Sequence, residues 1–264
     1  MNWFGDLNPI LQALIATTFT WGITLLGALM VCFFKEVNKK ALNTILGFSA
    51  GVMIAASFWS LLLPSIELSE ELGYIAWGLP ALGFIFGGLF VLLSDKFLDK
   101  TLSDKNSIKK DSLKRSILLV SAITLHNIPE GMSIGVAFGG ISSGVSGMTL
   151  IGAIMLAIGI GIQNFPEGAA VSLPLRKEGF SRKKSFFIGQ ASALVEPISA
   201  VIGVILVLAV RSILPILLSF AAGAMITVAS RELLPESISE NKNLSTLGLI
   251  SGFVLMMVLD VALG

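Results

Sequence analysis

The sequence has few charged residues. Asp, Glu, Lys and Arg make up 13% of its 264 residues, whereas hydrophobic residues make up 54% and the mean hydropathy is +0.87. A soluble globular domain carries about a quarter charged residues. The composition therefore excludes a large soluble domain and predicts an all-α integral membrane protein.

The sequence also contains a single cysteine and a single histidine, Cys32 and His126. One cysteine cannot form an intramolecular disulfide, and Cys32 lies in a long apolar run, where it is interpreted as small apolar filler. No thiolate site for copper(I) or zinc can be built from it. One histidine also excludes the H-E-x-x-H motif of zinc proteases.

The apolar runs predict eight membrane spans, since each span needs roughly 20 mostly apolar residues. We expect the spans at residues 10–34, 41–63, 75–94, 116–139, 147–173, 186–209, 212–234 and 244–262. They leave no room for a second domain, so residues 1–264 are expected to form one transmembrane domain. The first run is too long for a signal peptide and has no basic leader, which makes it the first span.

Lysine and arginine gather in the loops that follow spans one, three, five and seven, whereas the even-numbered loops hold only Arg211. The positive-inside rule then places the odd-numbered loops in the cytoplasm and both termini outside. Basic loops of this kind favour an orientation signal over nucleic-acid binding, so the lipid bilayer is an expected partner and nucleic acid is not. The short chain suits a bacterial inner membrane.

Two short motifs nearly repeat each other inside apolar runs: residues 126–131 read HNIPEG and residues 163–168 read QNFPEG. Each motif places two ligand-type side chains four residues apart on one helix face. The pairs are His126 with Glu130, and Gln163 with Glu167. Polar and ionisable residues are costly inside a membrane and are usually functional there. Because consecutive spans run in opposite directions, we expect the two motifs to meet near the midplane.

Further polar side chains accompany the two motifs. Glu196 is a third carboxylate within an apolar run. Neutral amide oxygens come from three residues: Asn127, Gln163 and Asn164. A proline stands next to each of the three glutamates and frees the carbonyl four residues back, which for Pro197 is the carbonyl of Ala193.

Together these residues offer one imidazole, three carboxylates and three amides. Two carboxylates close together in a low dielectric cannot both stay ionised without a cation or a shared proton. Glu130 and Glu167 are therefore expected to bridge a pair of metal ions. The donor set suits zinc, cadmium, ferrous iron or manganese better than copper(I). Zn²⁺ or a similar ion would be bound substrate, and no cofactor is expected.

A weaker repeat relates spans two and seven. Residues 48–54 (FSAGVMI) resemble residues 220–226 (FAAGAMI), and a Leu-Pro pair follows at 63–64 and at 234–235. Span two runs outward and span seven inward, so the copies are inverted, as in many transporters. The simplest arrangement is three helices, a central pair and three helices. Acidic residues near span ends, Glu67, Glu232 and Glu236, are secondary candidates for an ion route.

The paired P-E-G motifs, the Val-Glu-Pro segment at 195–197 and the eight-span layout resemble the ZIP (Zrt-, Irt-like protein) family of divalent-metal transporters. Residues 160–176 are most similar to its GufA-like branch. The resemblance implies a binuclear site through which zinc enters the cytoplasm. One metal would be held by His126, Glu130, Gln163 and Glu167. The other would be held by Asn127, Asn164, Glu130, Glu167 and Glu196, with the glutamates of spans four and five bridging.

Three features depart from the family pattern. Gln163 stands where many members carry histidine, which bears on affinity and metal choice. Asn164 stands where some carry aspartate, which bears on the second metal. Residues 95–115 are rich in lysine and aspartate instead of histidine, so regulation by a histidine-rich loop is not expected.

The sequence therefore predicts a transporter of zinc and related divalent ions, and not an enzyme. A metal-selective channel and a proton-coupled exchanger are alternatives within transport, because facing carboxylates hold protons as well as ions. An intramembrane metalloenzyme is the remote alternative. The oligomeric state is left open, a homodimer included.

Overall fold

The computed structural model describes residues 2–263 except 35–37, 103–107, 146–147, 210 and 240. It does not describe the side chains of residues 2, 39, 98–99, 101–102, 108–119, 122, 126, 177, 211 and 263. The described part consists of helices and turns, without a strand. An all-α membrane protein is confirmed.

The α-helices are α1 (Asn2–Gly5), α2 (Pro9–Phe33), α3 (Lys39–Ala56), α4 (Leu63–Glu71), α5 (Gly78–Leu102), α6 (Ile108–Ser142), α7 (Leu150–Lys177), α8 (Arg182–Ala191), α9 (Val195–Ala209), α10 (Leu214–Val228), α11 (Leu234–Ser237) and α12 (Lys242–Val258). Four short irregular helices join or end them: η1 (Ser57–Leu62), η2 (Arg211–Ile213), η3 (Ala229–Leu233) and η4 (Leu259–Leu263).

Seven stretches of the described residues are long and apolar enough to cross a membrane: Pro9–Phe33, Lys40–Glu71, Gly78–Phe97, Leu150–Arg176, Arg182–Ala209, Leu214–Ser237 and Lys242–Ala262. Each corresponds to one predicted span. The remaining prediction, residues 116–139, lies within α6, a 35-residue helix that is not among the seven. Part of α6 lies outside the described side chains.

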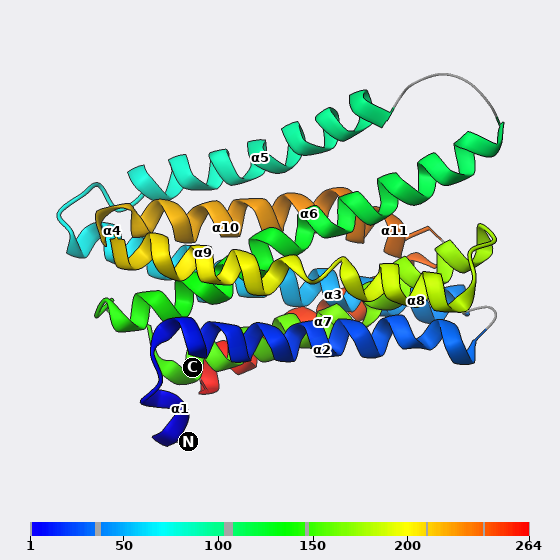
Figure 1. Ribbon diagram of the computed structural model, residues 1–264. Coiled ribbons are helices and arrows are strands. Elements are labelled where there is room, and N and C mark those ends of the chain that lie inside the picture. Colours follow the sequence, from blue (N-terminus) through cyan, green and yellow to red (C-terminus); the bar gives the residue numbers. More distant parts are fainter. Residues whose placement is uncertain are drawn as a thin grey trace.

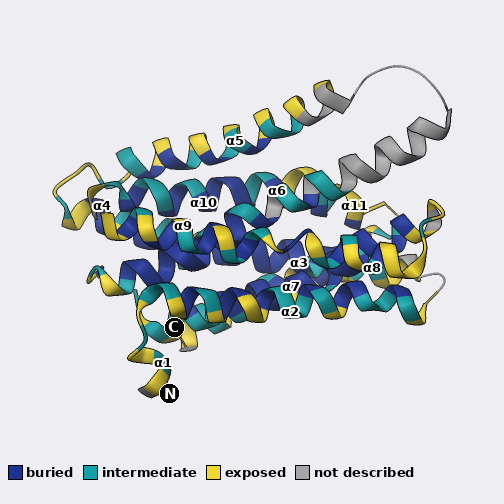
Figure 2. Cartoon of the chain, viewed as in Figure 1, coloured by how far each residue is buried: buried dark blue, intermediate teal, exposed yellow. Residues whose placement is uncertain are grey.

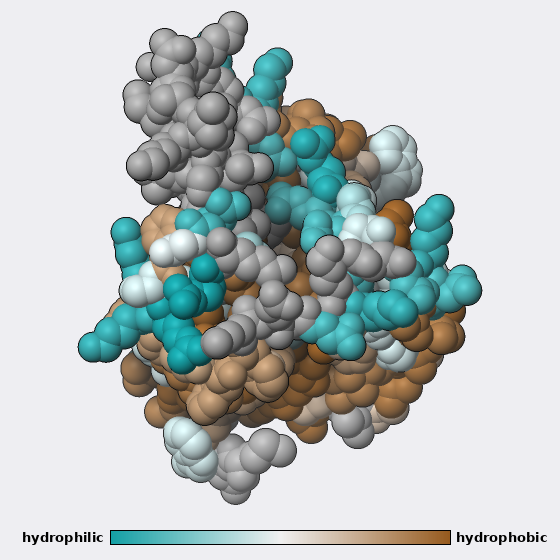
Figure 3. Space-filling view, turned by 90° about the vertical axis from the view of Figure 1, so that its right-hand side faces the viewer, coloured by the Kyte–Doolittle hydropathy of each residue, from teal (hydrophilic) through white to brown (hydrophobic). Residues whose placement is uncertain are grey.

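The long helices run back and forth, so successive connections alternate between the two ends of the molecule (Figure 1). The two termini share one end, and α2, α5, α7 and α11 end at the other. Hydrophilic side chains gather at that second end (Figure 3). Exposed cations there include Lys40, Arg182, Lys183, Lys184 and Lys242. The charge asymmetry predicted from the loops is thus present in the fold.

Polar side chains cap the starts of several helices. Asn8, Thr149 and Asn241 each accept a hydrogen bond from the backbone N–H three residues on, at 2.9, 2.8 and 3.1 Å. Ser181 does the same at 3.2 Å. Such caps satisfy N–H groups that have no partner within the helix. They place the helix starts at the polar ends of the apolar runs.

The helices group into two bundles. We call α2, α6, α7 and α9 the carboxylate bundle, and α3, α5, α10 and α12 the second bundle. Within them α2 packs most closely on α7, α6 on α9, α3 on α12 and α5 on α10. Between them α3 lies against α7 and α10 against α6. Figure 2 shows buried residues on the faces between helices and exposed residues along outer faces such as that of α5.

Glycine allows close approach within each of the four pairs. A Cβ on a glycine of each pair would lie 1.9–2.1 Å from a backbone oxygen of the other helix, so any larger residue would push the pair apart. These contacts join Gly27 to Phe165, Gly51 to Leu249, Gly87 to Phe220 and Gly135 to Ala200. Gly159 and Gly161 on α7 face side chains instead.

The two copies of the weak sequence repeat share a local irregularity. In η1 the N–H of Leu63 bonds to the carbonyl of Phe58, and in η3 the N–H of Leu234 bonds to that of Ala229. Both bonds span five residues, one more than in an α-helix, and both precede a proline that has no N–H to donate. The weak sequence repeat therefore corresponds to a shared backbone feature.

The sixth predicted span is not one continuous helix. Residues 192–194 form a turn between α8 and α9. The expectation that the carbonyl of Ala193 lacks a donor is wrong, because it accepts a hydrogen bond from the N–H of Glu196 at 3.1 Å. The break places Glu196 in the first turn of α9, where the positive end of the helix dipole favours a carboxylate.

Candidate metal centre

The two repeated motifs meet between α6 and α7. The Gln163 side chain donates a hydrogen bond from Nε2 to Oε1 of Glu130 at 2.6 Å, and both residues are fully buried. The helices remain α-helical through Pro129 and Pro166. The predicted meeting of the motifs is confirmed for this pair.

The broken span completes the polar centre. Asn164 donates from Nδ2 to Oε1 of Glu196 at 2.8 Å. Asn127 donates from Nδ2 to the carbonyl of Ser192, in the turn between α8 and α9, at 2.9 Å. The hydroxyl of Thr20 on α2 donates to the other carboxylate oxygen of Glu196. These hydrogen bonds thus link the two close pairs of the carboxylate bundle, α2–α7 and α6–α9, to each other.

Glycine in each motif permits this closeness. A Cβ on Gly131 would lie 2.3 Å from the carbonyl oxygen of Glu196, and one on Gly168 would lie 2.1 Å from that of Thr24. The residue after each motif glutamate is therefore a contact point with α9 or α2. The repeated P-E-G thus combines a carboxylate with the small residue that lets a neighbouring helix approach.

The centre contains several buried oxygen atoms without a hydrogen-bond donor. They are Oδ1 of Asn127, Oε2 of Glu130, Oε1 of Gln163, Oδ1 of Asn164 and both carboxylate oxygens of Glu167. Only two other described side-chain atoms, on Ser185 and Asp260, share this condition. An unpaired buried polar atom is costly, and here all six in the centre are acceptors. Such a set of acceptors fits a bound cation, and it also fits hydrogen-bond donors such as water.

The three carboxylates lie close enough for their charges to interact, Glu130 with Glu167 and Glu196, and Glu167 with Glu196. Among the described side chains, no three of His, Cys, Asp or Glu stand together as a ready-made metal cluster. Side-chain N–H groups of Gln163 and Asn164 donate to Glu130 and Glu196, so two of the three carboxylates are hydrogen-bonded to amides. His126 lies on α6, but its side chain is outside the described residues, so its predicted role stays a prediction.

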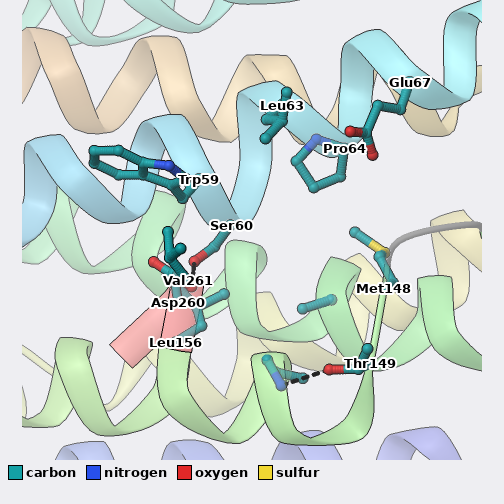
Figure 4. A pocket seen from close by; sticks show the side chains of 13 residues that line it. Trp59, Ser60, Leu63, Pro64, Glu67, Met148, Thr149, Leu156, Asp260 and Val261 are labelled. Carbon is teal, nitrogen blue, oxygen red and sulfur yellow. Dashed lines mark hydrogen bonds between the residues drawn. The ribbon is translucent and has the colours of Figure 1, made fainter. Parts of the chain in front are cut away.

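Two cavities lie toward the ends of the molecule from this centre. We call the one toward the end with the two termini the outer cavity and the other the inner cavity. The outer one, about 300 Å³, is lined by Glu67, Ser60 and Asp260 among others (Figure 4). Ser60 donates to Asp260 at 2.6 Å. The inner one, about 530 Å³, is lined by Glu167, Arg231, Glu232 and Glu236 together with apolar residues of α3, α6 and α7. Only the inner cavity includes a residue of the polar centre among its lining.

Sequence reasoning missed Thr20. It belongs to a row of buried threonines on α2, Thr17, Thr20 and Thr24, spaced three and four residues apart. That spacing places them on one helix face. The row was a usable sign that α2 turns a polar face toward the centre. Met53 is buried in the main apolar core.

Comparison with known proteins finds zinc transporters. The family model of the ZIP zinc transporters matches residues 100–260. The zinc transporter ZIP11 of Homo sapiens is 38% identical, covering 97% of this chain and 98% of its own. The zinc transporter GufA of Myxococcus xanthus is 34% identical over 95% and 98%.

This chain belongs to the ZIP zinc transporter family. A further ZIP relative, the zinc transporter ZIPB of Bordetella bronchiseptica, is 37% identical and covers 91% of this chain and 78% of its own. The match extends over nearly the whole length, so the helices that carry the polar centre and those of the second bundle are both part of the ZIP fold. Divalent-metal transport is accordingly the activity of the family to which the chain belongs.

Proposed function

We propose that this protein carries zinc, and with it cadmium, ferrous iron and manganese, into the cytoplasm through a binuclear site between α6, α7 and α9. The observation that carries the proposal is the set of six buried acceptor oxygens without a donor. One metal would bind His126, Glu130, Gln163 and Glu167. The second would bind Asn127, Asn164, Glu130, Glu167 and Glu196.

Ion binding requires only local changes in this centre. Turning each amide of Gln163 and Asn164 exchanges its N–H₂ for its oxygen, which replaces a donor toward a carboxylate by a metal ligand. Glu130 and Glu167 would then bridge the two ions, and the charge of the ions offsets the repulsion among the carboxylates. Without metal, the amide donors hold Glu130 and Glu196 in place. The metal-free and metal-bound states of the centre would thus differ mainly in the orientation of the two amides.

We place eight spans in the membrane, with α6 as the fourth, in a 3+2+3 arrangement. The pairing of helices supports this order: under the inverted repeat, the pair α3–α12 corresponds to α10–α5, and α2–α7 corresponds to α9–α6. The cationic end of the molecule would face the cytoplasm and both termini the outside, by the positive-inside rule. A bacterial inner membrane suits this topology.

A carrier fits the geometry better than a channel. The described site residues are at most 4% exposed, and the outer cavity does not include any of them in its lining. Movement of one bundle against the other would expose the centre to each side in turn. The inner cavity, which reaches Glu167, would be the path of release.

The test is metal flux into liposomes that contain the purified protein. We expect zinc uptake that saturates, with Glu130→Ala and Glu167→Ala reducing it to background while each variant still folds and inserts. Glu70→Ala, an exposed acidic residue on α4, is the matched control and should transport normally. Running zinc, cadmium, ferrous iron and manganese in parallel ranks the metals.

Two results would overturn the proposal. Unchanged flux in both variants would exclude this centre as the route. Tight zinc binding that depends on Glu167 but without flux would indicate a sensor or an enzyme. Uptake that follows a pH gradient would favour exchange with protons over simple carriage.

A further inference from the structure

The lining of the inner cavity contains three carboxylates and one permanently charged side chain, the guanidinium of Arg231. Its lining includes Glu167, Glu232 and Glu236, and Arg231 is the one basic residue in that lining. A cavity with three carboxylates and no counter-charge would retain a divalent ion strongly. An ion held tightly in this cavity would be released slowly to the cytoplasm, and slow release would lower the rate of transport.

Arg231 lies at the mouth of the cavity on η3. Its Nε is 3.3 Å from Oδ2 of Asp95 on α5, and the two side chains are 50% and 19% exposed. A half-exposed ion pair is weak and is screened by water and salt. The guanidinium can therefore turn between Asp95 and the cavity without a large cost.

A guanidinium cannot itself be a metal ligand, because it has no lone pair to offer and stays protonated in proteins. It can only compete with the ion for carboxylates. We infer that Arg231 is a fixed counter-cation that limits how tightly the inner cavity retains the transported ion, while Asp95 sets how far the guanidinium reaches into it. The inference rests on the proposed transport through Glu167.

The first test is Arg231→Gln, with Lys40→Gln as the control. Lys40 is an exposed cation at the same end of the molecule and is not in the cavity lining. Saturation curves of zinc flux into liposomes should show a maximal rate for Arg231→Gln lowered by about three- to tenfold, the size expected for one charge in a partly hydrated cavity. The half-saturating zinc concentration should fall by a similar factor. Lys40→Gln should change neither.

The second test separates this role from a structural link between α5 and η3. Asp95→Asn frees Arg231 to lie against the cavity carboxylates, so the half-saturating concentration should rise, opposite to Arg231→Gln. The exchange Arg231→Asp with Asp95→Arg restores an ion pair but removes the cation from the cavity. It should behave like Arg231→Gln or show still tighter retention.

Three outcomes decide the matter. Opposite shifts in the two single variants, without rescue in the exchange, support the counter-cation. Unchanged kinetics in Arg231→Gln overturn it. Parallel losses of rate and thermal stability in both single variants, repaired in the exchange, assign the pair to structure instead. Loss of flux in Glu167→Ala in the same preparations keeps the proposed function intact in any of these cases, whereas normal flux in that variant would remove both proposals.

Discussion

The two bundles of this protein are packed alike but carry different side chains. Both consist of two helix pairs brought together by glycine against backbone. Yet Glu130, Glu167 and Glu196 all lie in the carboxylate bundle, whereas the second bundle turns mostly apolar side chains toward it. The difference shows that the backbone arrangement does not decide where the chemistry is placed. A site confined to one bundle can also move as a unit against the other.

The largest expected effect concerns the carboxylates. Glu196→Ala removes a proposed metal ligand that also joins α9 to α2 and α7. It should lower zinc flux by at least about a hundredfold, because losing a ligand should cost no less than losing a group that orients one. Glu67→Ala, on the outer cavity and in the other half of the molecule, should cost a few-fold at most. Liposome flux measures both. Equal losses would show that the chemistry is not confined to one bundle.

The next effect concerns stability and should be the same in both bundles. Gly135→Ala and Gly87→Ala place a Cβ 2.0 and 1.9 Å from a backbone oxygen, so each pair of helices must separate. We expect each to cost about 1–3 kcal/mol of stability, seen as a lower midpoint of thermal unfolding in detergent. Gly22→Ala is the control, because a Cβ there meets nothing within 4 Å. It should keep or raise the midpoint, since alanine favours helix.

A smaller effect should follow from Thr20→Val, which deletes the hydroxyl donated to Glu196 and keeps the shape of the side chain. We expect about tenfold weaker zinc binding or flux, as for other groups that orient a ligand. Thr17→Val removes a hydroxyl of the same helix face that donates to the carbonyl of Ala13 at 2.7 Å instead. Titration of zinc into both proteins should separate them. If Thr17→Val has the same effect, Thr20 acts through the packing of α2 alone.

Much of the architecture follows from the sequence because it depends on composition and short-range pattern. Apolar runs locate seven of the spans to within several residues, and the repeated P-E-G motifs predict that Glu130 and Gln163 meet. The cost of polar groups in lipid makes such residues informative one by one. The assignment of the seven residues as metal ligands, in contrast, stays a prediction.

Other features depend on tertiary contacts that no local pattern contains. The turn at 192–194 interrupts an apolar stretch whose sequence predicts one continuous helix. Asn127 on α6 stabilises this turn by donating a hydrogen bond to the carbonyl of Ser192. The pairing of Arg231 with Asp95 joins residues far apart in the chain. The spacing of the threonines on α2 indicates a polar face, but only the contact with Glu196 shows that Thr20 belongs to the centre. In each case the partner, and not the residue itself, supplies the information.

The smallest expected change lies at the contact between the bundles. A Cβ on Gly159 of α7 would lie 2.3 Å from the sulfur of Met256 and 3.6 Å from a methyl of Val52, both in the second bundle. A thioether can move aside, so Gly159→Ala should alter the unfolding midpoint less than Gly135→Ala does. If the bundles move against each other during transport, the added methyl should still change the maximal rate of flux a few-fold, and Met256→Ala in the same protein should reverse the change. An unaltered rate in Gly159→Ala, with normal folding, would argue that this contact does not slide.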